Sequence, residues 1–353
     1  MKGIYKNIVL PFMVILLTGC STDSGMDQEM GSHLNHKGTV ADIQTEDTVE
    51  STESEGVEPE NTLTMFQPSD QFEDIIYDGE IKNLQGAVAG REHIFLYGYT
   101  EDGAHHIYIM KNGETTAVQS DAEWNEDEKR IRCMAADESG KCYVLMMSVS
   151  EDSIDCKTTE IMVIETDGKV AGTIDISNQM KELDWKIIPD GISIDKEGNI
   201  YLFSEADKYS VTIVNKDGEI LGRQERKSEW YIEGIGRGRD GAVYIVYSNA
   251  DEYSIGKIET NGEVMRTYEN VLPEAFGKYK YIFPGTDSNL LIYGKAGIYA
   301  YTDGTKAEER VAKGDMDFNA EAKVLGFLAD GRLVLSDLDE EGIRHFFYIP
   351  TVK

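Results

Sequence analysis

From about residue 75 to the end of the chain, short runs of alternating apolar and polar residues are separated by turns that contain glycine. The pattern is clearest in PDGISIDKEGNIYLFSEADKYSVTIVNKDGEILG, from Pro189, and in EGIGRGRDGAVYIVYSNADEYSIGKIETNGEVMR, from Glu233. Alternation predicts half-buried strands, and Asp-Gly or Asn-Gly between two such runs predicts a tight hairpin. Each stretch therefore predicts four antiparallel strands with an acidic loop in the middle.

The four-strand unit recurs along the rest of the chain. From Gly198 onward its first turn returns roughly every 45 residues, which together with four strands per unit is typical of a β-propeller. We predict an all-β fold, a six-bladed β-propeller over residues 71–353. The units begin near Leu84, Ile131, Ile188, Ile232, Tyr281 and Lys323.

The last unit is one strand short. After Lys323 only three strand patterns remain, AKVLGFLA, RLVLSDL and RHFFYIP, whereas one unassigned pattern, FEDIIYDGEIKN, precedes the first unit. An incomplete blade would present unpaired backbone groups along an exposed edge. We therefore predict that the N-terminal strand joins the last blade and closes the ring.

The first twenty residues have a different pattern. Lys2 and Lys6 precede an apolar run from Ile8 to Leu17, which is too short to span a bilayer and is typical of a secretory signal peptide. The run ends in Leu17-Thr18-Gly19-Cys20, which resembles the bacterial lipobox, where the cysteine is lipidated and becomes the first residue. Two acyl chains, such as palmitate, anchor a protein stably where one does not.

We therefore predict a signal peptide over residues 1–19, lipidation of Cys20, and a bacterial surface lipoprotein held on the extracytoplasmic face of the cell membrane. An ordinary signal peptide with a chance cysteine is the alternative. Residues 20–70 are rich in Ser, Thr, Gly, Glu and Asp and poor in apolar side chains. Such a segment cannot bury enough apolar surface to fold, so we expect a disordered acidic linker.

Charge narrows the range of partners. The chain has 34 basic and 65 acidic residues, a net charge of −31. This excess argues against binding of nucleic acid, which requires a basic surface. The expected partners are the membrane, through the lipid anchor, and a small-molecule, glycan or protein ligand.

The cysteines predict neither a disulfide framework nor a zinc site. With Cys20 assigned to lipid, an odd number remains, Cys133, Cys142 and Cys156, and no CxxC motif occurs. We predict no cofactor, and the acidic loops leave Ca²⁺ as the only metal to consider.

One repeat carries a family resemblance. IPDGISIDKEGNIYLF, at Ile188–Phe203, resembles a repeat of the NHL/TolB-like six-bladed propellers, and the overall plan is similar from about Ile75 to Tyr348. The resemblance implies that loops entering the innermost strands share one face with loops between the second and third strands. It selects no function, because propellers include binders, lyases, lactonases and dehydrogenases.

Aromatic and acidic residues are concentrated on the face that the resemblance implies. All three tryptophans fall in entering loops, and Asp190 and Glu233 start inner strands near the mouth of the axial channel. Flat rings beside carboxylates suit sugars, peptides or cationic groups. The alternative is that the rings pack between blades. The predicted ligand-binding residues are Trp124, Trp185, Asp190, Trp230, Glu233 and Tyr281.

Evidence for catalysis is sparse. The chain contains no GxSxG, HExxH, Walker or dinucleotide-binding motif, and we predict no catalytic residue. A ligand-binding propeller without catalysis is therefore favoured. The alternative is a metal-dependent hydrolase or lactonase with its site at the channel mouth, and a third class is a scaffold for other envelope proteins.

Overall fold

The computed structural model describes most of the second compact unit of the chain, Glu60–Lys353. The predicted signal peptide and Cys20 lie outside the described residues, as does the predicted linker apart from Met65–Phe66. The described residues are 65–66, 73–75, 81, 83–99, 105–112, 114–118, 129–149, 156–182, 189–204, 209–225, 230–249, 252–269, 271–272, 279–285, 288–294, 297–312, 323–330, 332–338, 344–349 and 351–352.

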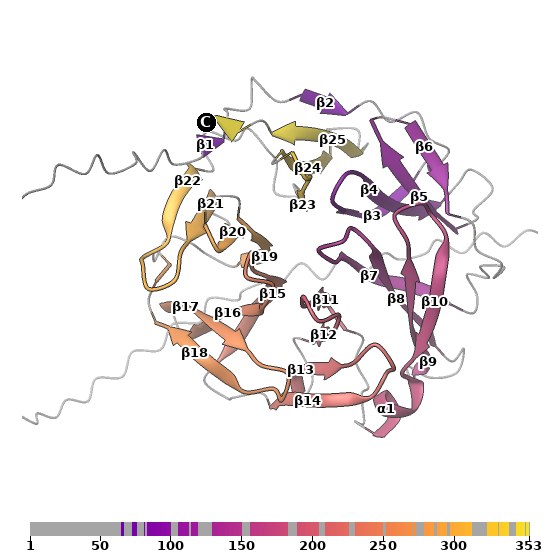
Figure 1. The fold of residues 1–353 in the computed structure, drawn as a ribbon, viewed down its shortest axis with the longest axis horizontal. Coiled ribbons are helices and arrows are strands. Elements are labelled where there is room, and N and C mark those ends of the chain that lie inside the picture. Colours follow the sequence, from indigo (N-terminus) through magenta and orange to yellow (C-terminus); the bar gives the residue numbers. More distant parts are fainter. Residues whose placement is uncertain are drawn as a thin grey trace, which may run out of the picture. The chain divides into compact units, whose positions relative to one another are not determined.

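Six four-stranded antiparallel sheets surround a common centre, so this unit is the predicted six-bladed β-propeller (Figure 1). Each of the first five blades consists of four consecutive strands. From the centre outward, blade 1 consists of β3 (Asn83–Ala89), β4 (Ile94–Tyr99), β5 (His105–Lys111) and β6 (Glu114–Ala117). Blade 2 consists of β7 (Arg130–Ala136), β8 (Cys142–Val149), β9 (Cys156–Ile164) and β10 (Val170–Asp175). Blade 3 consists of β11 (Gly191–Ile194), β12 (Ile200–Phe203), β13 (Tyr209–Val214) and β14 (Ile220–Glu225).

Blades 4 and 5 follow the same plan. Their strands are β15 (Tyr231–Arg237), β16 (Val243–Asn249), β17 (Glu252–Ile258) and β18 (Val264–Tyr268), then β19 (Tyr279–Pro284), β20 (Leu290–Gly294), β21 (Gly297–Tyr301) and β22 (Glu308–Ala312). We call the face on which the inner strands begin the upper face, and the face on which they end the lower face.

Blade 6 combines the two ends of the propeller, as predicted. Its strands from the centre are β23 (Lys323–Phe327), β24 (Leu333–Leu338), β25 (Arg344–Ile349) and β2 (Glu73–Ile75). β2 pairs antiparallel with β25, with Ile75 opposite Phe346. Ile75 is 7% exposed and belongs to an apolar cluster shared by blades 6 and 1. The closing strand therefore contributes both backbone pairing and apolar packing.

Three short elements were not predicted, β1 (Met65–Phe66), β26 (Thr351–Val352) and α1 (Ser177–Glu182). β1, which falls in the segment expected to be linker, pairs with β26. The single described helix, α1, follows blade 2. The Asp175 carboxylate accepts hydrogen bonds from the Ser177 amide at 2.9 Å and its hydroxyl at 2.5 Å, which caps the first turn. No helix in the described part of the chain is long and apolar enough to cross a membrane.

The core of the propeller is divided among the junctions between blades. Each of six apolar clusters joins two neighbouring blades, and together they complete the circle. At the junction of blades 3 and 4, for example, Val211 and Ile213 pack with Val243 and Ile245, all at most 1% exposed. Burial at every junction holds the inner strands in fixed positions around the axis.

The turns on the lower face connect neighbouring blades. Gly198 and Gly241 have φ values of 86° and 79°, a left-handed conformation that glycine adopts without strain. The Lys196 amide donates to the carbonyl of Gly241 at 2.9 Å, and the Arg239 amide donates to the carbonyl of Asn289 at 2.9 Å. These hydrogen bonds tie blade 3 to blade 4 and blade 4 to blade 5 at the ends of their inner strands.

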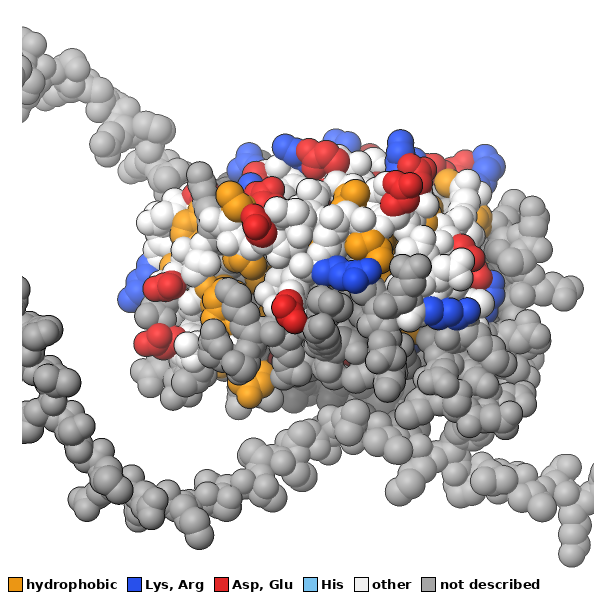
Figure 2. All heavy atoms as spheres, turned by 90° about the horizontal axis from the view of Figure 1, so that it is seen from below, with side chains coloured by type: hydrophobic (Ala, Val, Ile, Leu, Met, Phe, Trp, Pro, Cys, Tyr) orange, Lys and Arg blue, Asp and Glu red, His pale blue; other side chains and the backbone are white. Residues whose placement is uncertain are grey.

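The charged residues are mixed on the side of the ring shown in Figure 2. Acidic and basic side chains alternate along one edge, and orange apolar side chains are interspersed among them. Within the described part of the chain, three large apolar side chains are well exposed, Leu221, Tyr231 and Met265.

Candidate functional site

An axial cavity of about 620 Å³ lies between the inner strands of the propeller. All six inner strands, β3, β7, β11, β15, β19 and β23, contribute to its walls. The volume is within the roughly 300–1,000 Å³ that is usual for small-molecule sites. Because the inner strands are fixed by the blade junctions, the cavity has preformed walls.

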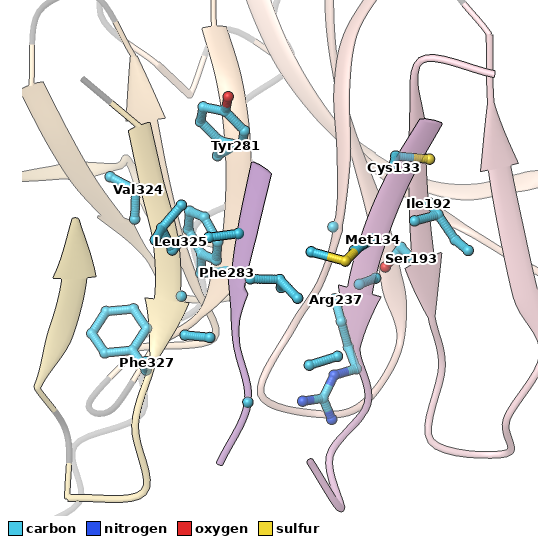
Figure 3. A pocket seen from close by; sticks show the side chains of 18 of the residues that line it. Cys133, Met134, Ile192, Ser193, Arg237, Tyr281, Phe283, Val324, Leu325 and Phe327 are labelled. Carbon is cyan, nitrogen blue, oxygen red and sulfur yellow. The ribbon is translucent and has the colours of Figure 1, made fainter. Parts of the chain in front are cut away.

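Apolar side chains form part of the middle of the cavity, whose lining also includes the buried Ser193. Met134, Phe283 and Leu325, from three different blades, lie along it in Figure 3. Cys133 also lines the wall, and burial raises the pKa of its thiol to about 12. The thiol is therefore protonated at neutral pH and is not an activated nucleophile. This part of the cavity is suited to an apolar group of a ligand rather than to covalent chemistry.

Two of the predicted ligand-binding residues lie at the upper part of the cavity. Asp190, which is exposed, precedes β11, and Tyr281 is a half-buried residue of β19. Both line the axial cavity. Figure 3 places Tyr281 at the end of the cavity opposite Arg237. A carboxylate from blade 3 and a phenol from blade 5 thus line the same cavity.

Glu233 is directed elsewhere. Its carboxylate accepts a 2.7 Å hydrogen bond from the hydroxyl of Ser248, a buried residue of β16. Glu233 lies where the pairing of β15 with β16 shifts between Ile232 and Gly234, and such a bulge redirects a side chain. It is not among the residues that line the cavity.

Among the predicted tryptophans, Trp124 and Trp185 lie outside the described residues. Trp230 is half-buried and stacks on Tyr247, with ring centroids 4.3 Å apart and an interplanar angle of 23°. It packs against the cluster at the junction of blades 3 and 4 and does not line the cavity. The contacts of Trp230 are those expected if the aromatic rings pack between blades.

The lower part of the cavity contains a residue that the sequence analysis did not select. Arg237 is the last residue of β15, and its side chain extends along the lower part of the cavity in Figure 3. The side chain is only 15% exposed, and burial lowers the pKa of the guanidinium, although Arg remains charged in proteins. Its Nη1 atom lies 3.4 Å from Oε2 of Glu138, whose side chain is 71% exposed. Arg237 could have been identified from the sequence as a basic residue at the end of an inner strand in a chain of net charge −31.

No metal centre is formed by the residues that the structure describes. Within them, no three His, Cys, Asp or Glu side chains come close enough together to hold an ion. His93 is 5% exposed and packs edge-on against Phe95, and burial lowers the pKa of its imidazole. It therefore belongs to the core of blade 1 as a neutral side chain.

Comparison with known proteins adds no assignment beyond the fold. No family model matches the chain, and no curated protein matches it. Similar solved structures include the major allergen Mala s 1 of Malassezia sympodialis (13% identity, 75% of this chain and 91% of that chain, TM-score 0.49). They also include a catalytically inactive virginiamycin B lyase from Staphylococcus aureus with quinupristin (14%, 79% and 99%, 0.46) and YCF48 bound to D1 peptide (11%, 83% and 99%, 0.45). Likenesses at this level carry no argument about what the chain binds.

Proposed function

We propose that the protein is a lipid-anchored, extracytoplasmic β-propeller that binds a ligand in its axial cavity without catalysis. The observation that carries the proposal is the arrangement of the cavity, with apolar side chains along its middle and charged or phenolic groups at both ends. Binding sites in proteins combine apolar walls with a few placed polar groups in this way. Small molecules and the protruding ends of peptides or glycans have the size that such a cavity accepts.

Two observations favour binding over hydrolysis. The carboxylate of Glu233, which the lactonase alternative would use, is hydrogen-bonded to Ser248 within its own blade. The Cys133 thiol is held in its neutral form. Turnover of lactones or esters that is abolished by EDTA would contradict the proposal and favour the hydrolase alternative.

The cavity proposal predicts that filling the cavity prevents binding. A thermal-shift screen of sugars, peptides and small acids against the chain identifies ligands, and Met134→Trp is then expected to weaken their binding by about tenfold or more. Met134 lies along the middle of the cavity, so an indole there occupies the space that a ligand needs.

Met265→Trp is the matched control, because Met265 is 61% exposed on β18 and does not line the cavity. Isothermal titration of both variants measures the two affinities. If Met134→Trp binds the ligands as tightly as Met265→Trp does, the ligand site is not the axial cavity.

Substitution of Cys20 tests the predicted lipid anchor. Cys20→Ala removes the sulfur that would carry the lipid, so the protein is expected to leave the membrane fraction or to accumulate as an unprocessed precursor. Cell fractionation with immunoblotting measures the distribution, and Cys156→Ala controls for loss of a cysteine elsewhere. Normal cleavage with continued membrane association of Cys20→Ala would show that the lipobox interpretation is wrong.

A further inference from the structure

Arg237 has more hydrogen-bonding capacity than its surroundings use. A guanidinium carries five N–H donors and no acceptor. Among the described residues, the acceptor for Arg237 is Glu138, at an N–O distance of 3.4 Å, beyond the usual range for a charge-assisted hydrogen bond. The side chain of Glu138 is 71% exposed, so water screens its charge. The guanidinium is therefore only weakly compensated.

The other acid nearby is already occupied. The carboxylate of Asp137 accepts hydrogen bonds from the Ser139 hydroxyl at 2.7 Å, the Lys141 amide at 3.0 Å and the Tyr143 hydroxyl at 3.4 Å. These hydrogen bonds hold the turn that follows β7, and Asp137 acts on the Arg237 guanidinium through its charge alone. A second arginine, Arg91 of blade 1, also lines the lower part of the cavity. The lower lining thus holds two arginines and two acids, Asp137 and Glu138. Arg237 is distinguished by its low exposure, 15%, and by its long contact with Glu138, not by an excess of positive charge.

We propose that Arg237 binds the anionic group of the ligand, a carboxylate or a phosphate, while the apolar body of the ligand lies along Met134, Phe283 and Leu325. This inference rests on the proposed function and names the class of ligand, an anionic amphiphile. The planar guanidinium matches the two oxygens of a carboxylate or phosphate, and the low exposure of Arg237 strengthens the interaction. Glu138 competes with the ligand for the same guanidinium.

Three amphiphiles of equal chain length test the inference: decanoate, decan-1-ol and decyltrimethylammonium. The protein is the whole chain from residue 20 with Cys20→Ser, so that neither lipid nor detergent competes, and titrations stay below micelle-forming concentrations. Isothermal titration is expected to give an affinity for decanoate about tenfold higher than for decan-1-ol, with decyltrimethylammonium weakest. Inorganic phosphate, titrated alone, distinguishes binding of a free anion from binding of an amphiphile.

Two substitutions are expected to act in opposite directions. Arg237→Met keeps an apolar stem and removes the charge, so it should lower the affinity for decanoate about tenfold and leave decan-1-ol unchanged. Glu138→Gln removes the competing carboxylate and should raise the affinity for decanoate. The matched control is Arg239→Met, because Arg239 is exposed, lies two residues further on and does not line the cavity. It should leave both affinities unchanged.

Equal affinity of the native chain for decanoate and decan-1-ol, or equal losses in Arg237→Met and Arg239→Met, would overturn the inference. If thermal melts show that Arg237→Met does not fold, the Glu138→Gln variant is used to test the inference. A lower affinity of Glu138→Gln for decanoate would then overturn the inference. If decanoate does not bind, but Met134→Trp prevents the binding of other ligands from the screen, the inference of an anionic ligand is wrong and the proposed function stands. If Met134→Trp prevents no binding, the cavity proposal itself fails.

Discussion

Deletion of residues 1–80 is expected to lower the melting temperature of the propeller by about 10 °C or more, or to leave it aggregated. The deletion removes β2, which pairs with β25 and completes blade 6. Loss of the Ile75 side chain from the cluster between blades 6 and 1 alone costs about 2–5 kcal/mol. A loss of 1 kcal/mol lowers the melting temperature of a larger domain by about 2–4 °C. The exposed edge of β25 then offers a template for intermolecular pairing.

Two shorter deletions isolate the contribution of β2. Deletion of residues 1–59 removes the first compact unit and should leave the melting temperature of the propeller unchanged. Deletion of residues 1–70 also removes β1, which has only two pairs with β26, and should have a small effect. Calorimetry with size-exclusion chromatography compares the three proteins. The same melting temperature for deletions 1–59 and 1–80 would show that β2 does not close the ring.

Trp230→Ala is expected to lower the free energy of unfolding by about 3 kcal/mol. Fully buried aromatic residues cost about 3–5 kcal/mol when truncated to alanine, and Trp230 is half-buried. Its stacking on Tyr247 adds a contribution beyond buried area. The loss should appear as faster unfolding of the junction between blades 3 and 4, because the ring packs against the cluster there.

Tyr231→Ala provides the control for Trp230. Tyr231 is the next residue and is 57% exposed, so its truncation should change the free energy of unfolding by no more than about 0.5 kcal/mol. Urea unfolding and ligand titration are measured on the same two variants. A stable Trp230→Ala protein that has lost ligand affinity would contradict the packing role and restore the aromatic binding face.

The fold could be predicted because alternation and turn glycines are local signals. The predicted starts near Leu84, Ile131 and Lys323 fall within β3, β7 and β23, and Gly198 and Gly241 occupy the turns where φ is positive. The shortage of one strand after Lys323 was enough to place the N-terminal strand in blade 6. The existence and order of the strands in the six blades therefore followed from the sequence.

Elements too short to repeat a pattern were missed. β1 and β26 have two residues each, which cannot show alternation. The six-residue helix α1 depends on its cap from Asp175 and on the burial of Ile176 and Met180 against blades 2 and 3. The cap is a local contact, but the pairing of β1 with β26 and the burial of Ile176 and Met180 join distant parts of the chain, which a local pattern does not contain.

The site was only partly predictable for a related reason. The register of the repeats places Asp190 and Tyr281 at one end of the cavity, but a bulge in β15 turns Glu233 toward Ser248. The family resemblance indicates the loops that enter the inner strands, whereas Arg237 lies at the opposite end of β15 and so falls outside that prediction. Whether a side chain faces the axis or the neighbouring blade depends on local twist, which alternation alone does not determine.

The most direct test of ligand binding in the axial cavity is a crystal structure of the chain with a ligand from the thermal-shift screen. We predict electron density for the ligand between β7, β15, β19 and β23, with its charged group at Arg237. Ligand density on the outer surface of the blades, with the axial cavity left unoccupied, would contradict this location of the site.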